Sequence, residues 1–349
     1  MTDAPVTGAP VDLRSDTVAL PSPGMRAAMA EAELGDDMFG EDPTVRALEE
    51  RLCGLFGFSG ALFAPSGVMA NQIGLRLLVG PGEELVCDAE AHILAHEDGA
   101  PALHGGIQTR TLTSESGLID PRALAAFVRR GNSYTVGTRA VAVEQTHTRS
   151  GGNVHPLETL RGIRAVADAA GIAVHLDGAR IWNAHAATGV PLAEFGAPVA
   201  DTLSVCLSKG LGAPVGSVLL CDGELLGQAR KIRHRLGGGM RQAGVLAAAG
   251  LYALEHNLAR IGDDHSNAAL LADGLREAGC AVSAPETNIV LARTPAAEAV
   301  VEQASRHGVR VTSPAPGLLR LVTHLDVDKA GCEQAVRVLA KAIHGQSAG

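Results

Sequence analysis

Apolar residues along this chain alternate between two spacings. From about Pro43 they recur three and four residues apart, as Val45, Leu48 and Leu52 do, which is typical of one face of a helix. Short apolar runs separate such stretches: ALFAP comes first, a helix follows from about Ser66, and ELVCD and AVAVEQ come later. This rhythm predicts βαβ units.

The centre of the chain continues the pattern. Residues 157–170 are predicted as a helix that ends at Gly171, and IAVHLDGAR follows as a buried strand. The segment DTLSVCLSKGLGAPVGSVLLCD is predicted as two strands around a glycine-rich turn. Strands that are apolar on both faces and alternate with helices indicate an α/β fold with a mostly parallel sheet covered on both sides. In such sheets, ligands bind at the carboxyl ends of the strands.

The last hundred residues predict a second, smaller unit. A long helical segment begins at about Leu251, and NIVLAR, a helix near residues 296–307, VRVTS, LLRLVTH and a last helix from about Val327 follow it. The length of 349 residues exceeds the usual size of one hydrophobic core. We therefore expect three parts: a loose arm over residues 1–10, a large α/β domain over 11–250, and a small C-terminal α/β domain over 251–349.

Composition narrows the class of partner. The formal net charge of −9 argues against a nucleic-acid or anionic membrane surface, which would need a clustered basic face. Hydrophobic residues make up 46% of the chain and aromatic residues only 3%, so the core must consist mainly of Ala, Val and Leu. A small-molecule substrate is the expected partner.

The cysteines and the N-terminus add little chemistry. Six cysteines are scattered singly without zinc-site spacing, so we interpret them as reduced thiols. His92 and His96, four residues apart, imitate a helix-borne metal pair, but no third ligand is evident and no metal is expected. The first residues lack the pattern of a secretory leader, and no apolar run approaches the length of a membrane span. These features predict a cytoplasmic protein.

Lys209 is the first candidate for chemistry. It lies directly after the predicted strand SVCLS and before glycines, where an amine can be partly desolvated and can act as a nucleophile. An isolated lysine in this position is more often an ordinary surface residue. The presence of Asp177, at the end of the strand in HLDGARIWNA, favours a functional role for this lysine instead. A carboxylate that keeps a pyridine nitrogen protonated and an amine that holds an aldehyde carbon are what a pyridoxal-phosphate enzyme requires.

A phosphate site completes this inventory. In APSGVMANQIG an apolar strand passes through Ser66 and Gly67 into a helix. The N-terminus of a helix offers free N–H groups and the positive end of its dipole to a phosphate. Ordinary strand-to-helix turns look the same, so the motif gains meaning only together with Asp177 and Lys209.

The order of these motifs is similar to that of a known family. The segments VDLRSDTV, DDMFGEDPTV, PSGVMAN, EQTHTRSGG, HLDGARIWNA, LSKGLGAPVGS, GGGMRQ and LRLVTHLDV occur in turn over about residues 11–340. In this respect the chain resembles the low-specificity L-threonine aldolases of the β-eliminating lyase group. The resemblance implies a fold-type-I pyridoxal-phosphate enzyme of the transferase-like architecture. It also implies a homotetramer, a dimer of dimers, with active sites shared between subunits.

The resemblance assigns roles around the cofactor. It implies that Lys209 forms the Schiff base, that Asp177 pairs with the pyridine nitrogen, and that Arg180 lies near the phenolic oxygen of the ring. His92 matches the family histidine that stacks on the ring, and His147 matches the histidine beside the substrate hydroxyl.

Further matches concern the substrate and the neighbouring subunit. Ser15, in LRSDT, and Arg320, in LRLVTH, match groups that hold the substrate carboxylate, for which the bidentate fork of arginine is well suited. Arg241, in GGGMRQ, matches a cofactor-pocket residue that a neighbouring subunit can supply.

Three positions depart from the family pattern. Val68 stands where a threonine is common, so the phosphate must rely on the N–H groups of Gly67 and Val68. His96 stands where the family often has an aromatic residue, and His234 where a lysine is often seen. His96 and His234 fall near the substrate end, so the resemblance leaves the preference between threonine and allo-threonine open.

The expected reaction is the reversible aldol cleavage of L-threonine, L-allo-threonine and related β-hydroxy-α-amino acids to glycine and an aldehyde. His147, His92 or a water molecule is the expected base for the β-hydroxyl proton, and the sequence does not choose among them. A β-elimination or transamination would use the same Lys209 and Asp177. A non-catalytic pyridoxal-phosphate-binding regulator is a third interpretation, but no additional DNA-binding or partner-binding module is evident.

Overall fold

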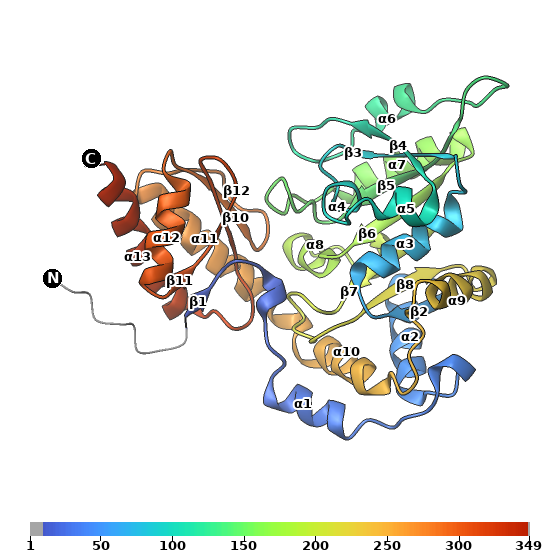
Figure 1. Cartoon of the computed structure of the whole chain (residues 1–349), viewed down its shortest axis with the longest axis horizontal. Helices are drawn as coiled ribbons and strands as arrows, with labels where there is room; N and C mark the ends of the chain where they lie inside the picture. The colour runs from blue at the N-terminus through green and yellow to red at the C-terminus, as the bar shows by residue number, and fades with distance from the viewer. Residues whose placement is uncertain (1–9, 348–349) are drawn as a thin grey trace.

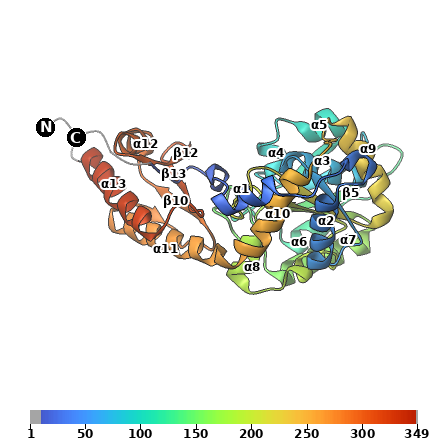
Figure 2. The same ribbon diagram turned by 90° about the horizontal axis from the view of Figure 1, so that it is seen from below.

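The computed structural model describes residues 10–347, so residues 1–9 of the expected arm lie outside the described part. The chain forms a large lobe and a smaller C-terminal lobe, which lie side by side in two perpendicular views (Figures 1 and 2). No helix within residues 10–347 combines the length and apolar character that a bilayer span needs.

A seven-stranded sheet forms the centre of the large lobe (Figure 1). Its strands follow the order β2-β8-β7-β6-β5-β3-β4. Neighbours from β7 to β4 are parallel, whereas β8 runs antiparallel to both β7 and β2, so β8 alone among these seven strands is reversed. The predicted mostly parallel α/β fold is confirmed. The strand bounds are β2 Gly60–Ala64, β3 Glu84–Asp88, β4 Gln108–Leu112, β5 Thr138–Glu144, β6 Ala173–Gly178, β7 Thr202–Cys206 and β8 Ser217–Cys221.

Both faces of the sheet are buried because alternate side chains of each strand point to opposite sides. In β2, Leu62 packs in one hydrophobic cluster and its neighbour Phe63 in another. Helix α3 covers the face of Leu62, whereas α2 and α7 contribute to the cluster of Phe63. The helices of this lobe are α1 Pro23–Ala30, α2 Pro43–Phe56, α3 Gly67–Leu78, α4 His92–Ala95, α5 Ala100–Gly105, α6 Pro121–Phe127, α7 Leu157–Ala170, α8 Ile181–Thr188, α9 Leu226–Arg235 and α10 Gly244–His256.

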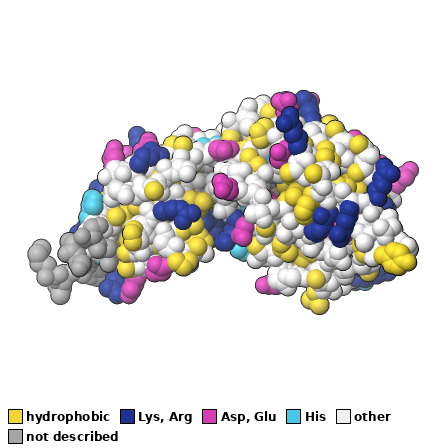
Figure 3. Space-filling model, turned by 90° about the horizontal axis from the view of Figure 1, so that it is seen from above, with side chains coloured by type: hydrophobic (Ala, Val, Ile, Leu, Met, Phe, Trp, Pro, Cys, Tyr) yellow, Lys and Arg dark blue, Asp and Glu magenta, His cyan; other side chains and the backbone are white. Residues whose placement is uncertain are grey.

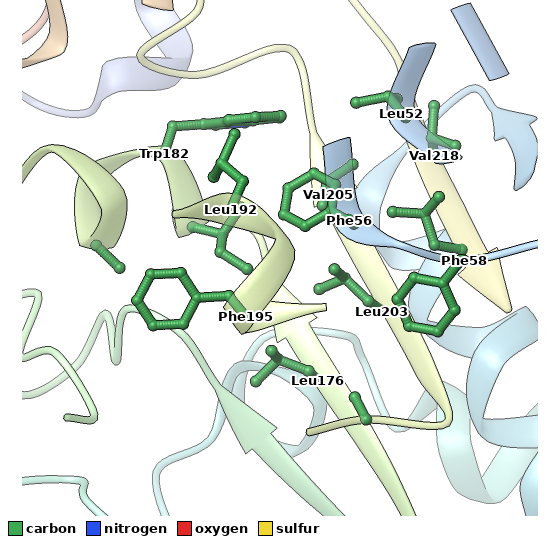
Figure 4. Packing of buried hydrophobic residues seen from close by; sticks show 14 of the residues in the cluster. Leu52, Phe56, Phe58, Leu176, Trp182, Leu192, Phe195, Leu203, Val205 and Val218 are labelled. Carbon is green, nitrogen blue, oxygen red and sulfur yellow. The ribbon is translucent and has the colours of Figure 1, made fainter. Parts of the chain in front are cut away.

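The main core lies on the face of the sheet that carries Phe63. Figure 4 shows Trp182 of α8, Phe56 of α2 and Phe195 packing with leucines and valines from the strands. The rings of Phe56 and Trp182 meet edge to face with centroids 5.5 Å apart. This packing fixes α8, and with it the turn between β6 and α8 that carries Arg180.

The small lobe contains a four-stranded antiparallel sheet in the order β12-β13-β10-β9. The first described strand, β1, also belongs here, because it pairs with β11 and the following Leu13 packs in the core of this lobe. The division at residues 250 and 251 stays a prediction. The bounds are β1 Val11–Asp12, α11 Ile261–Glu277, β9 Ala281–Val282, β10 Ile289–Arg293, α12 Ala297–Arg306, β11 Val309–Arg310, β12 Thr312–Ala315, β13 Leu318–Val322 and α13 Lys329–Ser347.

The long helix expected from Leu251 is two helices. Helix α10 starts seven residues earlier, at Gly244, and a short 3-10 segment over Leu258–Arg260 separates it from α11. At this break the side chain of Asn257 donates a hydrogen bond of 2.7 Å to the carbonyl of Leu211. Apolar spacing continues through the break, so periodicity alone could not reveal it.

Candidate active site

A cavity of about 350 Å³ opens between the two lobes. The space-filling view shows the molecule narrowing between them, with charged side chains nearby (Figure 3). Both lobes line the cavity: Lys209 comes from the large lobe and Arg320 from the small one. It gathers seven of the predicted site residues, namely Ser15, His92, His96, His147, Arg180, Lys209 and Arg320.

Lys209 follows β7 in the glycine-rich turn, as the sequence predicted. Its Nζ lies 3.1 Å from Sγ of Cys206, the last residue of β7. The hydroxyl of Ser217, in β8, lies 3.2 Å from the same sulfur. Because Cys206 and Ser217 are both buried, the amine is held at the floor of the cavity.

Asp177 lies near the end of β6 and is only 2% exposed. Its Oδ2 accepts a hydrogen bond of 2.8 Å from the side-chain amide of Asn71, in α3, and its Oδ1 accepts one of 3.1 Å from the N–H of Ala179. Asp177 does not line the main cavity, but a small adjoining space is lined by both Asp177 and His92. The carboxylate therefore lies behind His92 in a fixed orientation.

Helix α3 begins at Gly67, where the phosphate site was predicted. Ser66 caps the helix, and its hydroxyl accepts the N–H of Met69 at 3.2 Å. The N–H groups of Gly67 and Val68 belong to the first turn, where no earlier carbonyl of the helix can accept them. A Cβ on Gly67 would lie 2.7 Å from Sγ of Cys206, so a side chain at this position would collide with the residue that contacts Lys209. The helix N-terminus is thus close to the lysine.

Arg180 is held by Asp16 rather than left free. Its Nε and Nη2 donate to the two carboxylate oxygens of Asp16 at 2.8 and 2.6 Å, and its Nη1 donates to the hydroxyl of Thr148 at 2.8 Å. Burial alone would raise the pKa of Asp16, but the charge and hydrogen bonds of Arg180 outweigh it and lower this pKa to about 2. Arg180 therefore reaches the cavity as one member of a buried ion pair.

Arg320 extends from β13 into the cavity, and its Nε is a buried atom without a hydrogen-bond partner. Burial, assisted by the nearby charge of Arg180, lowers the pKa of Arg320 to about 10. A buried guanidinium with an unused donor favours an anionic ligand. Ser15, on the same cavity, caps a short 3-10 helix and accepts the N–H of Thr17 at 3.2 Å.

His92 and His96 lie on one wall of the cavity, at the two ends of α4. Their ring centroids are 5.6 Å apart. Nδ1 of His92 is 3.0 Å from Oε1 of Glu97. Burial would lower the pKa of His92, but the hydrogen bond to Glu97 and the charges of Asp177 and Glu144 raise it. Burial and the neighbouring His92 lower the pKa of His96.

His147 lies deeper and is only 1% exposed. Its Nδ1 lies 3.0 Å from the hydroxyl of Ser150, and its Nε2 lies 3.4 Å from Oδ1 of Asp88 and 3.9 Å from Oε2 of Glu144. Burial would lower the pKa of His147, but the contact with Asp88 and the charge of Glu144 raise it. Both ring nitrogens therefore face protein groups.

Arg241 and His234 do not line this cavity. The side chain of Arg241 is 65% exposed and pairs with Asp36 at 3.2 Å. His234, in the last turn of α9, is also exposed. Within a single copy of residues 10–347, neither side chain contributes to the cavity.

Sequence reasoning missed the partners that hold the predicted residues, above all Glu97, Asn71 and Asp16. Glu97 is visible in the sequence as an acidic residue five positions after His92, but its burial is not. Glu97, His92 and Asp177 also have potential ligand atoms within 4.8 Å of one another. Hydrogen bonds already link them, because Asn71 donates to both carboxylates.

These groups fit pyridoxal phosphate. An amine, a buried carboxylate and a helix N-terminus that starts with a glycine lie close together, and the close approach of Cys206 to Gly67 leaves no room for a side chain on the first residue of α3. The unpartnered Nε of Arg320 supplies a place for a substrate anion. Together the fold and the site define a fold-type-I pyridoxal-phosphate enzyme.

Comparison with known proteins makes the assignment specific. Residues 12–297 match the model of the beta-eliminating lyase family, and the chain belongs to that family. It is 39% identical over 331 residues to the low specificity L-threonine aldolase of Escherichia coli K12, covering 95% of this chain and 97% of that one. It is 42% identical over 287 residues to low-specificity L-threonine aldolase 1 of Arabidopsis thaliana, covering 80% of each. The protein is thus a pyridoxal-phosphate-dependent lyase.

Solved structures agree on the fold. The threonine aldolase of Leishmania major superposes with a TM-score of 0.83 at 20% identity, covering 95% of this chain and 99% of that chain. Serine palmitoyltransferase of Sphingomonas wittichii gives a TM-score of 0.75 at 19% identity, covering 97% of this chain and 88% of that chain. At these identities the likeness extends to the fold alone.

Proposed function

We propose that this protein cleaves L-threonine, L-allo-threonine and related β-hydroxy-α-amino acids to glycine and an aldehyde, and that it catalyses the reverse addition. The observation that carries the proposal is one cavity lined by a lysine amine, a buried arginine with an unused donor, and histidines. Relatives at 39% and 42% identity, named low-specificity L-threonine aldolases, support this substrate class.

The groups proposed to hold the cofactor come from three elements. Lys209 binds its aldehyde carbon, Asp177 keeps its ring nitrogen protonated, and the N–H groups of Gly67 and Val68 bind its phosphate. Bound pyridoxal phosphate supplies an electron sink for the pair of electrons released when a bond to the α-carbon breaks. Arg180, held by Asp16 and Thr148, directs a fixed positive charge toward the edge of this site.

The remaining residues are proposed to orient the substrate and move its proton. Arg320, assisted by Ser15, binds the carboxylate of the amino acid, and the guanidinium fork sets the orientation of the α-carbon. A histidine accepts the proton of the β-hydroxyl group as the Cα–Cβ bond breaks. His92, His96 and His147 all line the cavity. His96 is proposed to contact the substrate.

A self-associated form is part of the proposal. Arg241 lies outside the cavity of its own chain and matches a cofactor-pocket residue that a neighbouring subunit can supply, which supports a site shared between two subunits. The resemblance extends this to a homotetramer built as a dimer of dimers. The six cysteines are all free, a state that is usual in a reducing compartment and supports a cytoplasmic location.

The experiment that tests the function begins with an absorption spectrum of the purified holoenzyme. L-threonine and L-allo-threonine are then added separately, and acetaldehyde and glycine are measured. A Schiff-base band together with aldehyde and glycine supports the proposal and reports the preference between isomers. Pyruvate with ammonia, or a keto acid, would instead establish the rival β-elimination or transamination at the same lysine.

A further inference from the structure

A buried carboxylate lies directly behind His92. Glu97, just beyond α4, is 3% exposed. Its Oε1 is 3.0 Å from Nδ1 of His92 and accepts a hydrogen bond of 2.8 Å from the amide of Asn71. Its Oε2 accepts one of 2.6 Å from the amide of Gln72. With donors on both oxygens, Glu97 has a single orientation.

These contacts assign the tautomer of His92. Both oxygens of Glu97 already act as acceptors toward amides, so Nδ1 of His92 is the donor in their contact. A neutral imidazole that carries its proton on Nδ1 has its lone pair on Nε2. Nε2 is thus the nitrogen that His92 can offer to the cavity.

His147 differs in this respect. Its Nδ1 lies 3.0 Å from the hydroxyl and 3.3 Å from the N–H of Ser150, a pair of contacts that fits either tautomer, and its Nε2 lies 3.4 Å from Asp88 without a hydrogen bond. The ring is 1% exposed and turned toward protein groups on both nitrogens. The contacts of His147 among the described residues therefore do not assign its proton to one nitrogen, in contrast to those of His92.

We propose that Glu97 is a positioning residue for the proton transfer, because it fixes the His92 ring with Nε2 available and so makes His92 the acceptor of the β-hydroxyl proton. The O–H bond of the substrate breaks, and an N–H bond forms at Nε2. This inference rests on the proposed aldol cleavage and adds the residue that prepares its base.

The position of Glu97 is rigid because Asn71 anchors it to the sheet. The amide of Asn71 donates to both Glu97 and Asp177 at 2.8 Å. Its Oδ1 accepts hydrogen bonds from Ser204 and His175, in β7 and β6. One side chain of α3 therefore sets the distance between the carboxylate behind His92 and the carboxylate proposed for the ring nitrogen.

Charged groups face His92 from several elements. Glu97 follows α4, Glu144 ends β5 and accepts the backbone N–H of His92 at 2.9 Å, Asp177 comes from β6, and His96 ends α4. The carboxylates favour the protonated imidazole, whereas burial and a charged His96 oppose it. Removal of the charge of Glu97 should therefore lower the pKa of His92.

The substitution Glu97→Gln removes this charge while keeping the network. The new carbonyl oxygen can accept from Asn71 and His92 in place of Oε1. The new amide nitrogen meets Gln72, whose Oε1 is buried and without a partner and can turn to accept it. Glu97→Ala, in contrast, leaves the amides of Asn71 and Gln72 without their acceptor. Glu49→Gln provides a matched control, because Glu49 is a buried carboxylate that accepts the N–H of Phe63 away from the cavity.

The experiment measures the titration of His92 in holoenzyme labelled at histidine, with its signal assigned by a His92→Asn variant, alongside the pH dependence of kcat/KM with L-threonine. For Glu97→Gln we expect the pKa of His92 and the acid limb of kcat/KM to move together by about one unit to lower pH. We also expect kcat to fall about tenfold because the base is weaker. Glu97→Ala should in addition mix the tautomers, and Glu49→Gln should match the wild type.

An unchanged His92 titration and pH profile in Glu97→Gln would overturn the inference, while release of aldehyde and glycine by the wild-type enzyme would leave the proposed function intact. If the wild type released no aldehyde, the proposed function would fail, and the base assignment for Glu97 would fail with it. The titration would then report only the contact with His92.

Discussion

Arg180 and Asp16 form a bidentate ion pair in which both side chains are almost completely buried. The two residues are 164 positions apart in the chain. Asn288, just before β10 of the small lobe, also donates to Asp16 at 3.3 Å. The N-terminal segment, the start of α8 and the small lobe therefore meet at one carboxylate.

Removing one partner of this ion pair should destabilise the folded protein. In Asp16→Ala the guanidinium of Arg180 stays buried without its counterion, and we expect a loss of about 3 to 5 kcal/mol in the free energy of unfolding. Urea unfolding of the holoenzyme measures it. Asp168→Ala is the matched control, because Asp168 is 66% exposed in its pair with Arg164 and should cost less than about 1 kcal/mol. Equal losses in the two variants would contradict the buried role of Asp16.

The lowered pKa of Asp16 predicts that the folded protein loses stability in acid. The pKa of Asp16 is about 2 in the folded protein against the ordinary value of 3.8, so the unfolded chain binds the proton more readily. The stabilisation is fully present above about pH 4 and is lost as the pH falls toward 2, and it amounts to about 2 kcal/mol. Unfolding free energies of the wild type and Asp16→Asn should therefore converge in this range. A constant difference down to pH 2 would contradict the prediction.

Glu49 predicts the opposite pH dependence. Burial raises its pKa to about 7 from the ordinary 4.5, although the N–H of Phe63 and the charge of Arg230 oppose the shift. The folded protein then binds the proton more readily, so stability falls as the pH rises from about 4.5 to 7, by about 3 kcal/mol. Glu49→Gln should remove this slope and be the more stable protein at pH 8. Thermal or urea unfolding across this range measures the difference.

Lys209→Ala should abolish turnover and the Schiff-base absorbance together. No other lysine lines the cavity among the described residues, so a replacement nucleophile is absent. Lys231→Ala, an exposed lysine of α9, is the control that should keep both properties. Absorbance and aldehyde release at the wild-type level in Lys209→Ala would refute the assignment of the amine.

The substitution Arg320→Lys tests whether substrate binding needs the planar geometry of the guanidinium in addition to its positive charge. The ammonium keeps the positive charge but loses the planar pair of donors, so we expect kcat/KM for L-threonine to fall about tenfold to a hundredfold, or about 1.4 to 2.7 kcal/mol. Steady-state kinetics measure it. Arg293→Lys, on an exposed position of β10, should leave kcat/KM unchanged. An unchanged kcat/KM in Arg320→Lys would remove Arg320 from the substrate site.

Much of the fold follows from local patterns. The helix over residues 157–170 and the strands around Asp177 and Lys209 are where the spacing of apolar residues predicts them. The break between α10 and α11 was missed, because a single tertiary hydrogen bond from Asn257 accompanies it while the apolar spacing continues.

The sequence by itself determined the elements and the identity of the groups at the strand ends, because alternation of apolar residues and the placement of glycines are local properties. Tertiary structure alone decided which groups face one another. Asn71 meets Asp177 across 106 positions, and Arg180 meets Asp16 across 164. Such pairs form only when the sheet and the two lobes bury their apolar faces, so no local spacing encodes them. For the same reason the sequence left His147, His92 or a water molecule as possible bases, and only the tertiary structure shows the hydrogen bonds that orient Glu97 behind His92.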